Sequence, residues 1–133
     1  MLYEFHKDLR QVKVNAEKRA DYVLAAVFIS KDKLCVLDAN REINVCNFDG
    51  SSNKRVAVNR KDLGKIESIY PAPLGRVLID ADDHLLLYDL SAKKVINEVQ
   101  IQEIKRVYWN NGFTHAAIIS AKGKFQLIRK CIV

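Results

Sequence analysis

The densest group of residues that could do chemistry is Asp82-Asp83-His84, in which two carboxylates precede an imidazole. Carboxylate oxygens and imidazole nitrogens are common ligands of divalent metal ions. The triplet falls between two apolar runs, however, and aspartate is favoured in tight turns because its side chain accepts hydrogen bonds from nearby backbone. The sequence therefore predicts a turn here and no metal site.

Nucleophilic catalysis would need a serine or cysteine beside a base and an orienting acid. Cys35 and Cys46 lie inside apolar runs, where cysteine behaves as a small hydrophobic residue. The three cysteines of the chain have no Cys-x-x-Cys spacing, so neither a zinc site nor a disulfide framework is indicated. No glycine-rich phosphate loop occurs among the five glycines. We therefore expect no enzyme activity, no cofactor and no metal.

The charge balance leaves a second function class open. Basic residues outnumber acidic ones by 22 to 16, and the net charge of +6 permits binding to nucleic acid, anionic membrane or acidic protein. Tyr3, Tyr70, Tyr108 and Trp109 could stack on bases. The basic residues are scattered through turn-like stretches, and the aromatic residues stand beside apolar ones, which favours core packing. A basic nucleic-acid-binding module is thus the alternative hypothesis, and we expect no nucleic acid partner.

The sequence shows no targeting signal and has few cysteines. The chain begins Met1-Leu2-Tyr3-Glu4 without the features of a signal peptide, and its longest apolar run, residues 22–29, is too short to cross a bilayer. The scarcity of cysteine is typical of a reducing compartment. These features predict a cytoplasmic protein with no transmembrane segment.

Short segments rich in Val, Ile, Leu, Phe and Tyr predict β-strands along the whole chain, with Asp, Asn, Gly and Pro in the turns between them. Residues 9–20 come nearest to a helical period, but their apolar residues are sparse and we expect a charged connecting loop. The continuous run Leu85-Leu86-Leu87 indicates a strand buried on both faces. The expected strands are Leu2–Phe5, Val23–Ile29, Leu34–Ala39, Ile43–Phe48, Arg55–Val58, Ile66–Tyr70, Arg76–Ala81, Leu85–Leu90, Val95–Ile101, Ile104–Trp109, Ala116–Ala121 and Phe125–Arg129.

An internal repeat decides the architecture. Each copy consists of an apolar strand, a small polar residue with alanine, a short turn and a second apolar strand; the copies are residues 35–48, 77–90 and 117–130. The aligned residues Leu37, Ile79 and Ile119 are 42 and 40 positions apart. Four strands in about 40 residues is the period of a propeller blade of the WD-repeat kind.

The sequence therefore predicts an all-β chain that forms a partial β-propeller of about three four-stranded antiparallel WD-like blades. We expect the blades at residues 21–62, 63–102 and 103–133, the last without its outer strand. Residues 1–20 are expected to hold a strand of a preceding blade and the charged loop. His115 is expected to join a structural hydrogen-bond network at a blade edge, as in WD blades, and His6 receives no role.

An incomplete ring would leave two blade faces without a neighbour. We expect Val36, Leu85, Leu87 and Ile118 to line these faces and to form a candidate interface, because large exposed apolar patches mark interaction sites. The isolated chain is accordingly expected to self-associate, with two copies forming a six-bladed ring.

Residues 99–111 and 114–120, followed by Arg129-Lys130, resemble the coatomer alpha-subunit family in its second propeller, the WD-associated region. The beta-prime subunits of the same coat have a similar layout and remain an alternative. Further blocks that agree in order are Leu2-Tyr3-Glu4, Lys7-Asp8, Lys18-Arg19, residues 24–27, residues 34–38 and Leu87-Tyr88-Asp89.

The resemblance implies a scaffold role. Coatomer coats vesicles of Golgi-to-endoplasmic-reticulum and intra-Golgi transport, so the chain would act in the cytoplasm at the Golgi membrane through contacts with other coatomer subunits. Family members carry two propellers and a helical solenoid, so a chain of 133 residues is expected to be a fragment. The dilysine-cargo pocket of the family lies on the other propeller, and no binding residue is carried over.

Overall fold

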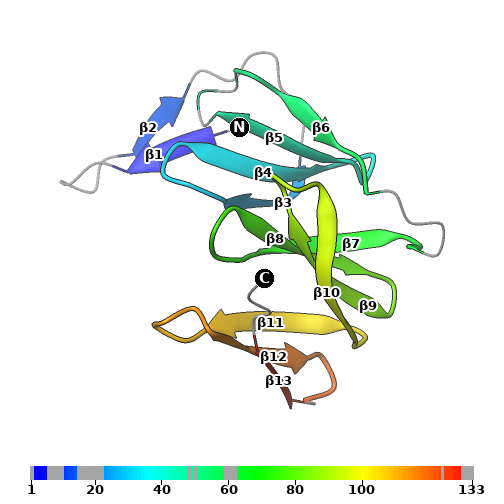
Figure 1. The fold of residues 1–133 in the computed structure, drawn as a ribbon. Coiled ribbons are helices and arrows are strands. Elements are labelled where there is room, and N and C mark those ends of the chain that lie inside the picture. The colour runs from blue at the N-terminus through cyan, green and yellow to red at the C-terminus, as the bar shows by residue number, and fades with distance from the viewer. Residues whose placement is uncertain are drawn as a thin grey trace.

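The computed structural model describes residues 2–5, 11–14, 23–47, 49, 51–58, 63–123 and 125–129. Every regular element among them is a β-strand, thirteen in total. Eleven strands form three antiparallel sheets in chain order, and each sheet is a simple meander (Figure 1). The all-β prediction is confirmed.

The strand bounds follow the predicted segments closely. The first sheet holds β3 (Val23–Phe28), β4 (Lys33–Asp38), β5 (Ile43–Asn47) and β6 (Lys54–Val56). The second sheet holds β7 (Ile66–Pro71), β8 (Arg76–Ala81), β9 (His84–Asp89) and β10 (Lys94–Gln100). The third sheet holds β11 (Ile104–Trp109), β12 (His115–Ser120) and β13 (Phe125–Arg129). Within the described residues the third sheet has three strands rather than four.

The N-terminal segment differs from the expected loop. Gln11–Val14 forms β2 and pairs with β1 (Leu2–Phe5), with Leu2 opposite Val14 and Phe5 opposite Gln11. The alternation of Gln11-Val12-Lys13-Val14 is typical of a strand. A strand at residues 2–5 also needs a partner for its backbone groups, and β2 supplies it. The expected connecting loop is therefore wrong for residues 11–14.

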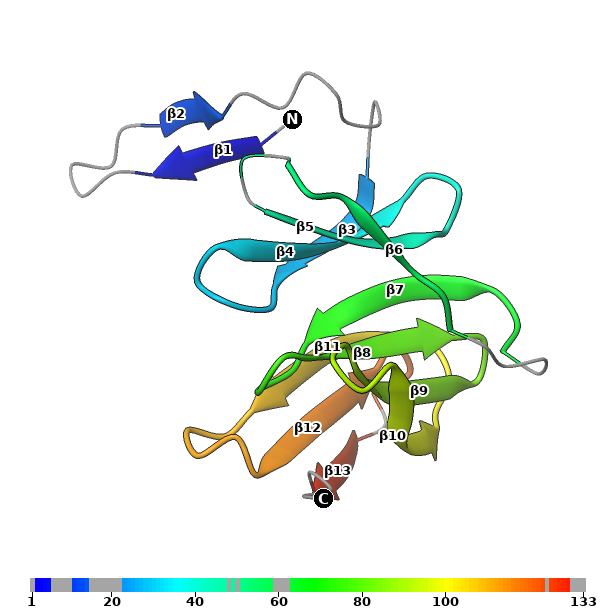
Figure 2. The same ribbon diagram turned by 45° about the horizontal axis from the view of Figure 1, so that its top comes forward.

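The second sheet lies between the other two (Figures 1 and 2). An apolar layer fills each of the two seams. The seam between the first and second sheets packs Cys35, Leu37 and Ile43 against Ile79 and Leu86, all at most 1% exposed. The guanidinium of Arg41 also donates to the Ile66 carbonyl oxygen over 2.8 Å across this seam. Removing such large apolar side chains from water stabilises the fold by roughly 1.5–3 kcal/mol each.

The seam between the second and third sheets combines apolar packing with two cross-sheet hydrogen bonds. Leu78 packs with Ile118, and Tyr70 and Trp109 border them. The hydroxyl of Tyr70 donates to the Ile104 carbonyl oxygen over 3.2 Å, and the indole of Trp109 donates to the Pro71 carbonyl oxygen over 2.8 Å. Two of the aromatic residues considered for base stacking are thus used between the sheets.

Each sheet begins with the same irregularity. The pairing of the first strand with the second shifts between Val23 and Ala25 in the first sheet, and between Ile66 and Ser68 in the second. A third shift lies between Ile104 and Arg106. Such a bulge gives one strand an extra residue and re-aims its side chain. In the second sheet that extra residue is Glu67.

Candidate functional site

Three of the four candidate interface residues are buried in the core of the fold. Leu85 and Leu87 on β9 and Ile118 on β12 are 1%, 4% and 0% exposed and belong to one cluster with Leu78. They fill the seam between the second and third sheets. The expectation that they line an uncovered face is wrong. Side chains alternate between the two faces of a strand, and these three point towards the neighbouring sheet.

Val36 lies apart from those three residues. It is 4% exposed and packs with Leu34 and Cys46 on the face of the first sheet that looks away from the second sheet. Phe28 pairs with Leu34 on the neighbouring strand and is 63% exposed. The outer face of the first sheet is therefore only partly covered by the described residues.

The outer face of the third sheet is a second open apolar surface. Tyr108, Phe125 and Leu127 are 52%, 65% and 60% exposed. Tyr108 and Leu127 both pair with Ala117 and form one row across the sheet, and Phe125 lies on the same face, two residues before Leu127. Sequence reasoning missed this outer face, although alternation from the buried Ile118 would have placed Ala117 and its neighbours on the opposite side.

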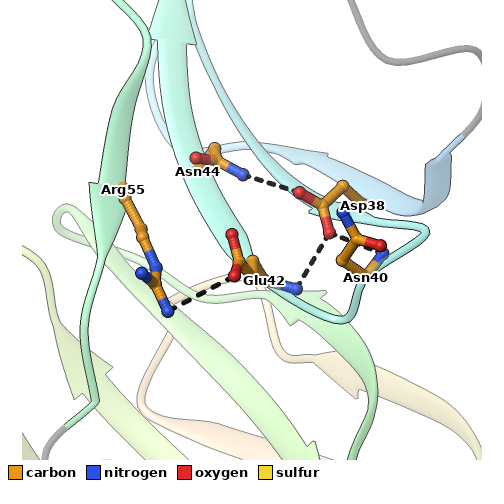
Figure 3. Close-up of polar contacts among 5 residues, drawn as sticks. All are labelled: Asp38, Asn40, Glu42, Asn44 and Arg55. Carbon is orange, nitrogen blue, oxygen red and sulfur yellow. Dashed lines mark hydrogen bonds and ion pairs between the residues drawn. The ribbon is translucent and has the colours of Figure 1, made fainter.

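The turn between β4 and β5 uses acidic residues to hold the backbone (Figure 3). One carboxylate oxygen of Asp38, Oδ1, accepts hydrogen bonds from the backbone amides of Asn40 and Glu42, both at 2.9 Å. The other, Oδ2, accepts one from the Asn44 side chain at 3.2 Å. Glu42 in turn lies 3.4 Å from the Arg55 guanidinium. Asp38 therefore has a complete structural role.

The turn between β9 and β10 uses Asp89 in the same way. Its carboxylate accepts from the amides of Ser91 and Ala92, at 2.9 and 2.8 Å, and lies 3.3 Å from the Arg76 guanidinium. The backbone hydrogen bond from Ala92, together with the side chain of Arg76, lowers the pKa of Asp89 below its ordinary value. This carboxylate also serves the fold.

An acidic cleft at one end of the second seam stands out from this pattern. Glu67 and Ser68 come from the start of β7, Asp82 and Asp83 from the turn between β8 and β9, and Gln102 and Glu103 from the connection between β10 and β11; Tyr70, Asp80 and Ile104 complete the lining. The cavity measures about 700 Å³. Its lining holds five carboxylates and no lysine, arginine or histidine from the described residues. We call it the acidic cleft.

Backbone geometry fixes the turn that carries two of these carboxylates. Asp82 has a φ of 51° and donates its amide to the Lys65 carbonyl oxygen over 3.0 Å. Gly64 lies directly beneath the turn, and a Cβ at this position would collide with the Asp82 carboxylate. Glycine is required here because both the space and its φ of 65° exclude a side chain.

Asp80 is the deepest group in the acidic cleft. It is 5% exposed, and its Oδ1 oxygen is buried without a hydrogen-bond partner. Alternation along β8 places it on the same face as Leu78, towards the third sheet. Burial, and then the charges of Glu67 and Asp82, raise the pKa of Asp80 to about 6. A nearby cation favours the ionised form of a carboxyl group, so a cation that enters the cleft would be attracted to Asp80.

Comparison with known proteins adds the family. The chain matches the COPA/B second beta-propeller over residues 3–130. It belongs to the COPA/B second beta-propeller family. It is 26% identical over 98 residues to coatomer subunit alpha of Dictyostelium discoideum, covering 73% of this chain and 8% of that protein. It is 27% identical over 112 residues to coatomer subunit alpha-1 of Oryza sativa subsp. japonica, covering 77% of this chain and 9% of that protein.

The fold comparison agrees with the family. A solved structure of KlHsv2 with loop 6CD replaced by a Gly-Ser linker superposes with a TM-score of 0.55 at 12% identity, covering 80% of this chain and 35% of that one. At that identity the likeness concerns the fold alone. The COPA/B chain is thus a partial β-propeller, as the repeat predicted, and its three sheets are blades. It spans less than a tenth of the length of the curated relatives.

The histidines of this COPA/B chain that the structure describes make local contacts within the fold. His84 lies 3.2 Å from Asp83 and 3.6 Å from Glu98, and the described residues include no group of three or more histidines, cysteines or carboxylates arranged to hold a metal ion. His115 contacts the Thr114 hydroxyl through its ring at 2.9 Å and donates its backbone amide to the Asn110 side chain at 3.0 Å, both at the start of β12. His6 lies outside the described residues.

The buried thiol of Cys35 is not a nucleophile. Burial, and then the neighbouring Cys46, raise the pKa of Cys35 to about 12. The thiolate is the reactive form of cysteine, so this group stays protonated and inert at neutral pH. In the part of the chain that the structure describes, no helix has the length and hydropathy of a membrane span.

Proposed function

We propose that this COPA/B propeller segment is a scaffold piece of a vesicle coat, which works through contacts with other coatomer subunits and carries no enzyme activity. Membership of the family over residues 3–130 is the observation that carries this proposal. Relatives named coatomer subunit alpha support it. The corresponding place of action is the cytoplasmic side of Golgi membranes, in Golgi-to-endoplasmic-reticulum and intra-Golgi transport. The alpha coat type is favoured over beta-prime by those names.

Binding to purified coat subunits tests the scaffold role. The chain would be immobilised and exposed to coatomer subunits one at a time, with an unrelated propeller on a second surface as the control. Saturable binding of at least one subunit to this chain alone is expected. Absence of binding to every subunit, together with no enrichment at Golgi membranes of a fluorescent fusion in cells, would contradict the proposal.

We further propose that the isolated chain self-associates through the outer face of its third blade. The seams inside the chain already join blades face to face through apolar side chains, and Tyr108, Phe125 and Leu127 offer a second copy the same kind of surface. Substitution Leu127→Glu would place a charge in that contact and is expected to give monomers. Leu74→Glu is the matched control, because Leu74 is 75% exposed in the turn between β7 and β8.

Multi-angle light scattering at micromolar concentration distinguishes the outcomes. Wild type and Leu74→Glu are expected to exceed the monomer mass of 15.2 kDa, whereas Leu127→Glu is expected to match it. A monodisperse wild-type monomer, or a Leu127→Glu variant that associates as the wild type does, would contradict self-association through this face.

A further inference from the structure

We propose that the acidic cleft binds a lysine or arginine side chain presented by a basic, extended segment of a partner protein, with Asp80 as the innermost contact. The inference rests on the lining of the cleft and not on the coat role. It assigns a recognition site to a part of the molecule that the scaffold proposal does not use.

The charge of the acidic cleft is the first argument. Glu67, Asp80, Asp82, Asp83 and Glu103 surround one cavity, although the chain as a whole carries a net charge of +6. Two basic side chains lie at the rim: the Arg41 guanidinium is 3.6 Å from Glu67, and the His84 ring is 3.2 Å from Asp83. The other three carboxylates retain a strong field for a cation, which low-dielectric walls concentrate.

The unpartnered oxygen of Asp80 is the second argument. A buried carboxylate without a partner is costly, and proteins normally pair such groups. Asp38, at the equivalent position of the first repeat, has three hydrogen bonds to its carboxylate, whereas Asp80 has an oxygen with none. A cation held against the Asp80 side chain would offset this penalty, and the gain would arise only on binding.

The shape and remaining lining indicate a protein segment rather than a bare ion. A volume of about 700 Å³ far exceeds one ammonium group. Tyr70 and Ile104 supply an apolar wall for the methylene stem of a long cationic side chain. Gln102 and Ser68 supply side-chain hydrogen-bonding groups for a peptide backbone. Such a mixed lining is typical of a peptide site.

A second cavity gives such a segment room to continue. Gln102 and Glu103 also line a neighbouring space of about 530 Å³ that runs towards Phe125 on β13. Lys122 lines that space, so the cationic side chain is expected at the Asp80 end and a neutral stretch beside Lys122. An extended segment could therefore lie along both cavities.

Fluorescence anisotropy with the whole chain tests the site. The probe is a labelled peptide of alternating lysine and serine, and a peptide of alternating glutamate and serine is the negative probe. Asp80→Asn and Glu103→Gln each remove one cleft charge with little change in shape. Asp32→Asn is the matched control, because it removes one charge from the exposed turn between β3 and β4. We expect each cleft variant to weaken binding about tenfold, and the control to change it less than about twofold.

Two readouts separate a lost contact from a lost fold. The melting temperature of Asp80→Asn is expected not to fall, since the variant removes a buried charge, so weaker binding by a fully folded variant supports the proposal. If Asp80→Asn and Asp32→Asn lost peptide affinity equally, the peptide would be attracted by the overall charge of the chain and not by the cleft, which would overturn the proposal. Spermine or Mg²⁺ competing more strongly than the lysine peptide would overturn the assignment to a protein segment.

Discussion

The first and second blades place an aspartate at the same position of the repeat, and the two aspartates have opposite fates. Asp38 accepts three hydrogen bonds in its own turn, whereas Asp80 is buried with one carboxylate oxygen unpaired. Both follow an apolar strand and precede alanine. Residue type and repeat position therefore do not decide whether a carboxylate serves the fold or faces a cavity.

The register of the hairpins explains the difference. In the first blade the last paired residues before the turn are Leu37 and Ile43, so Asp38 opens a loop whose amides it can reach. In the second blade pairing continues to Ala81 and His84, which leaves a turn of Asp82 and Asp83 alone. Asp80 then lies within the ladder opposite Leu85, and its side chain points across the seam instead of into the turn.

The largest expected contrast concerns Leu78 and Val36, which precede the two aspartates by two residues. Leu78→Ala should lower the free energy of unfolding by roughly 2–5 kcal/mol, because it leaves a cavity in the second seam. Val36→Ala should cost only about 1.5 kcal/mol, since two methyl groups are lost from a cluster of three residues. Urea unfolding followed by Trp109 fluorescence measures both. Equal losses would show that the two faces are equally packed.

The second contrast concerns pH. The folded-state pKa of Asp80 is raised from 3.8 to about 6, so its protonated form stabilises the fold. That contribution is present below about pH 4 and is lost as the pH rises through 6. The free-energy difference between Asp80→Asn and wild type should thus favour the variant more at pH 7.5 than at pH 4.5, by about 2 kcal/mol.

Chemical denaturation of both proteins at the two pH values measures this change. Because the variant differs at one group, the titration of residues that do not interact with Asp80 cancels in the difference. A difference that is the same at both pH values would mean that the pKa of Asp80 is not raised by folding.

The smallest contrast concerns the turn of the first blade. Asp38→Ala removes the acceptor of three hydrogen bonds and should destabilise the chain by roughly 1–2 kcal/mol. Asp38→Asn keeps one side-chain oxygen for the two backbone amides and should recover most of that loss. Thermal unfolding by circular dichroism compares the two variants. If Asp38→Ala were as stable as the wild type, the three hydrogen bonds to Asp38 would not stabilise this turn.

Much of the fold could be read from the sequence because strand and turn signals agree with the repeat. The predicted Arg76–Ala81 and Ile104–Trp109 are strands with those bounds in the structure. Gln11–Val14 was missed because the strand is short and its flanks are charged. The gapless alignment of the repeats also hid the different register of the second hairpin, which depends on the positive φ of Asp82.

The acidic cleft could not be predicted in the same way. Glu67, Asp80 and Glu103 are separated by more than a dozen residues each. The pairing of β7 with β8 brings Glu67 beside Asp80, and the connection to the third blade adds Glu103. Asp82 and Asp83 were correctly assigned to a turn, but a turn assignment does not tell which cavity its side chains border. The bulge that re-aims Glu67 likewise depends on backbone pairing and not on residue type.

The position of the second blade has a consequence for the order of unfolding. All six residues of β8 are buried because both of its faces meet a neighbour, whereas Phe125 and Leu127 on β13 are largely exposed. When each layer contacts only the next, stability is close to a sum of nearest-neighbour terms, and end layers can open without the centre. The rate of amide hydrogen exchange should therefore be lowest in β8, at the centre, and should rise towards the outer blades, with the highest rate in β13. The outer blades would then unfold before the central one.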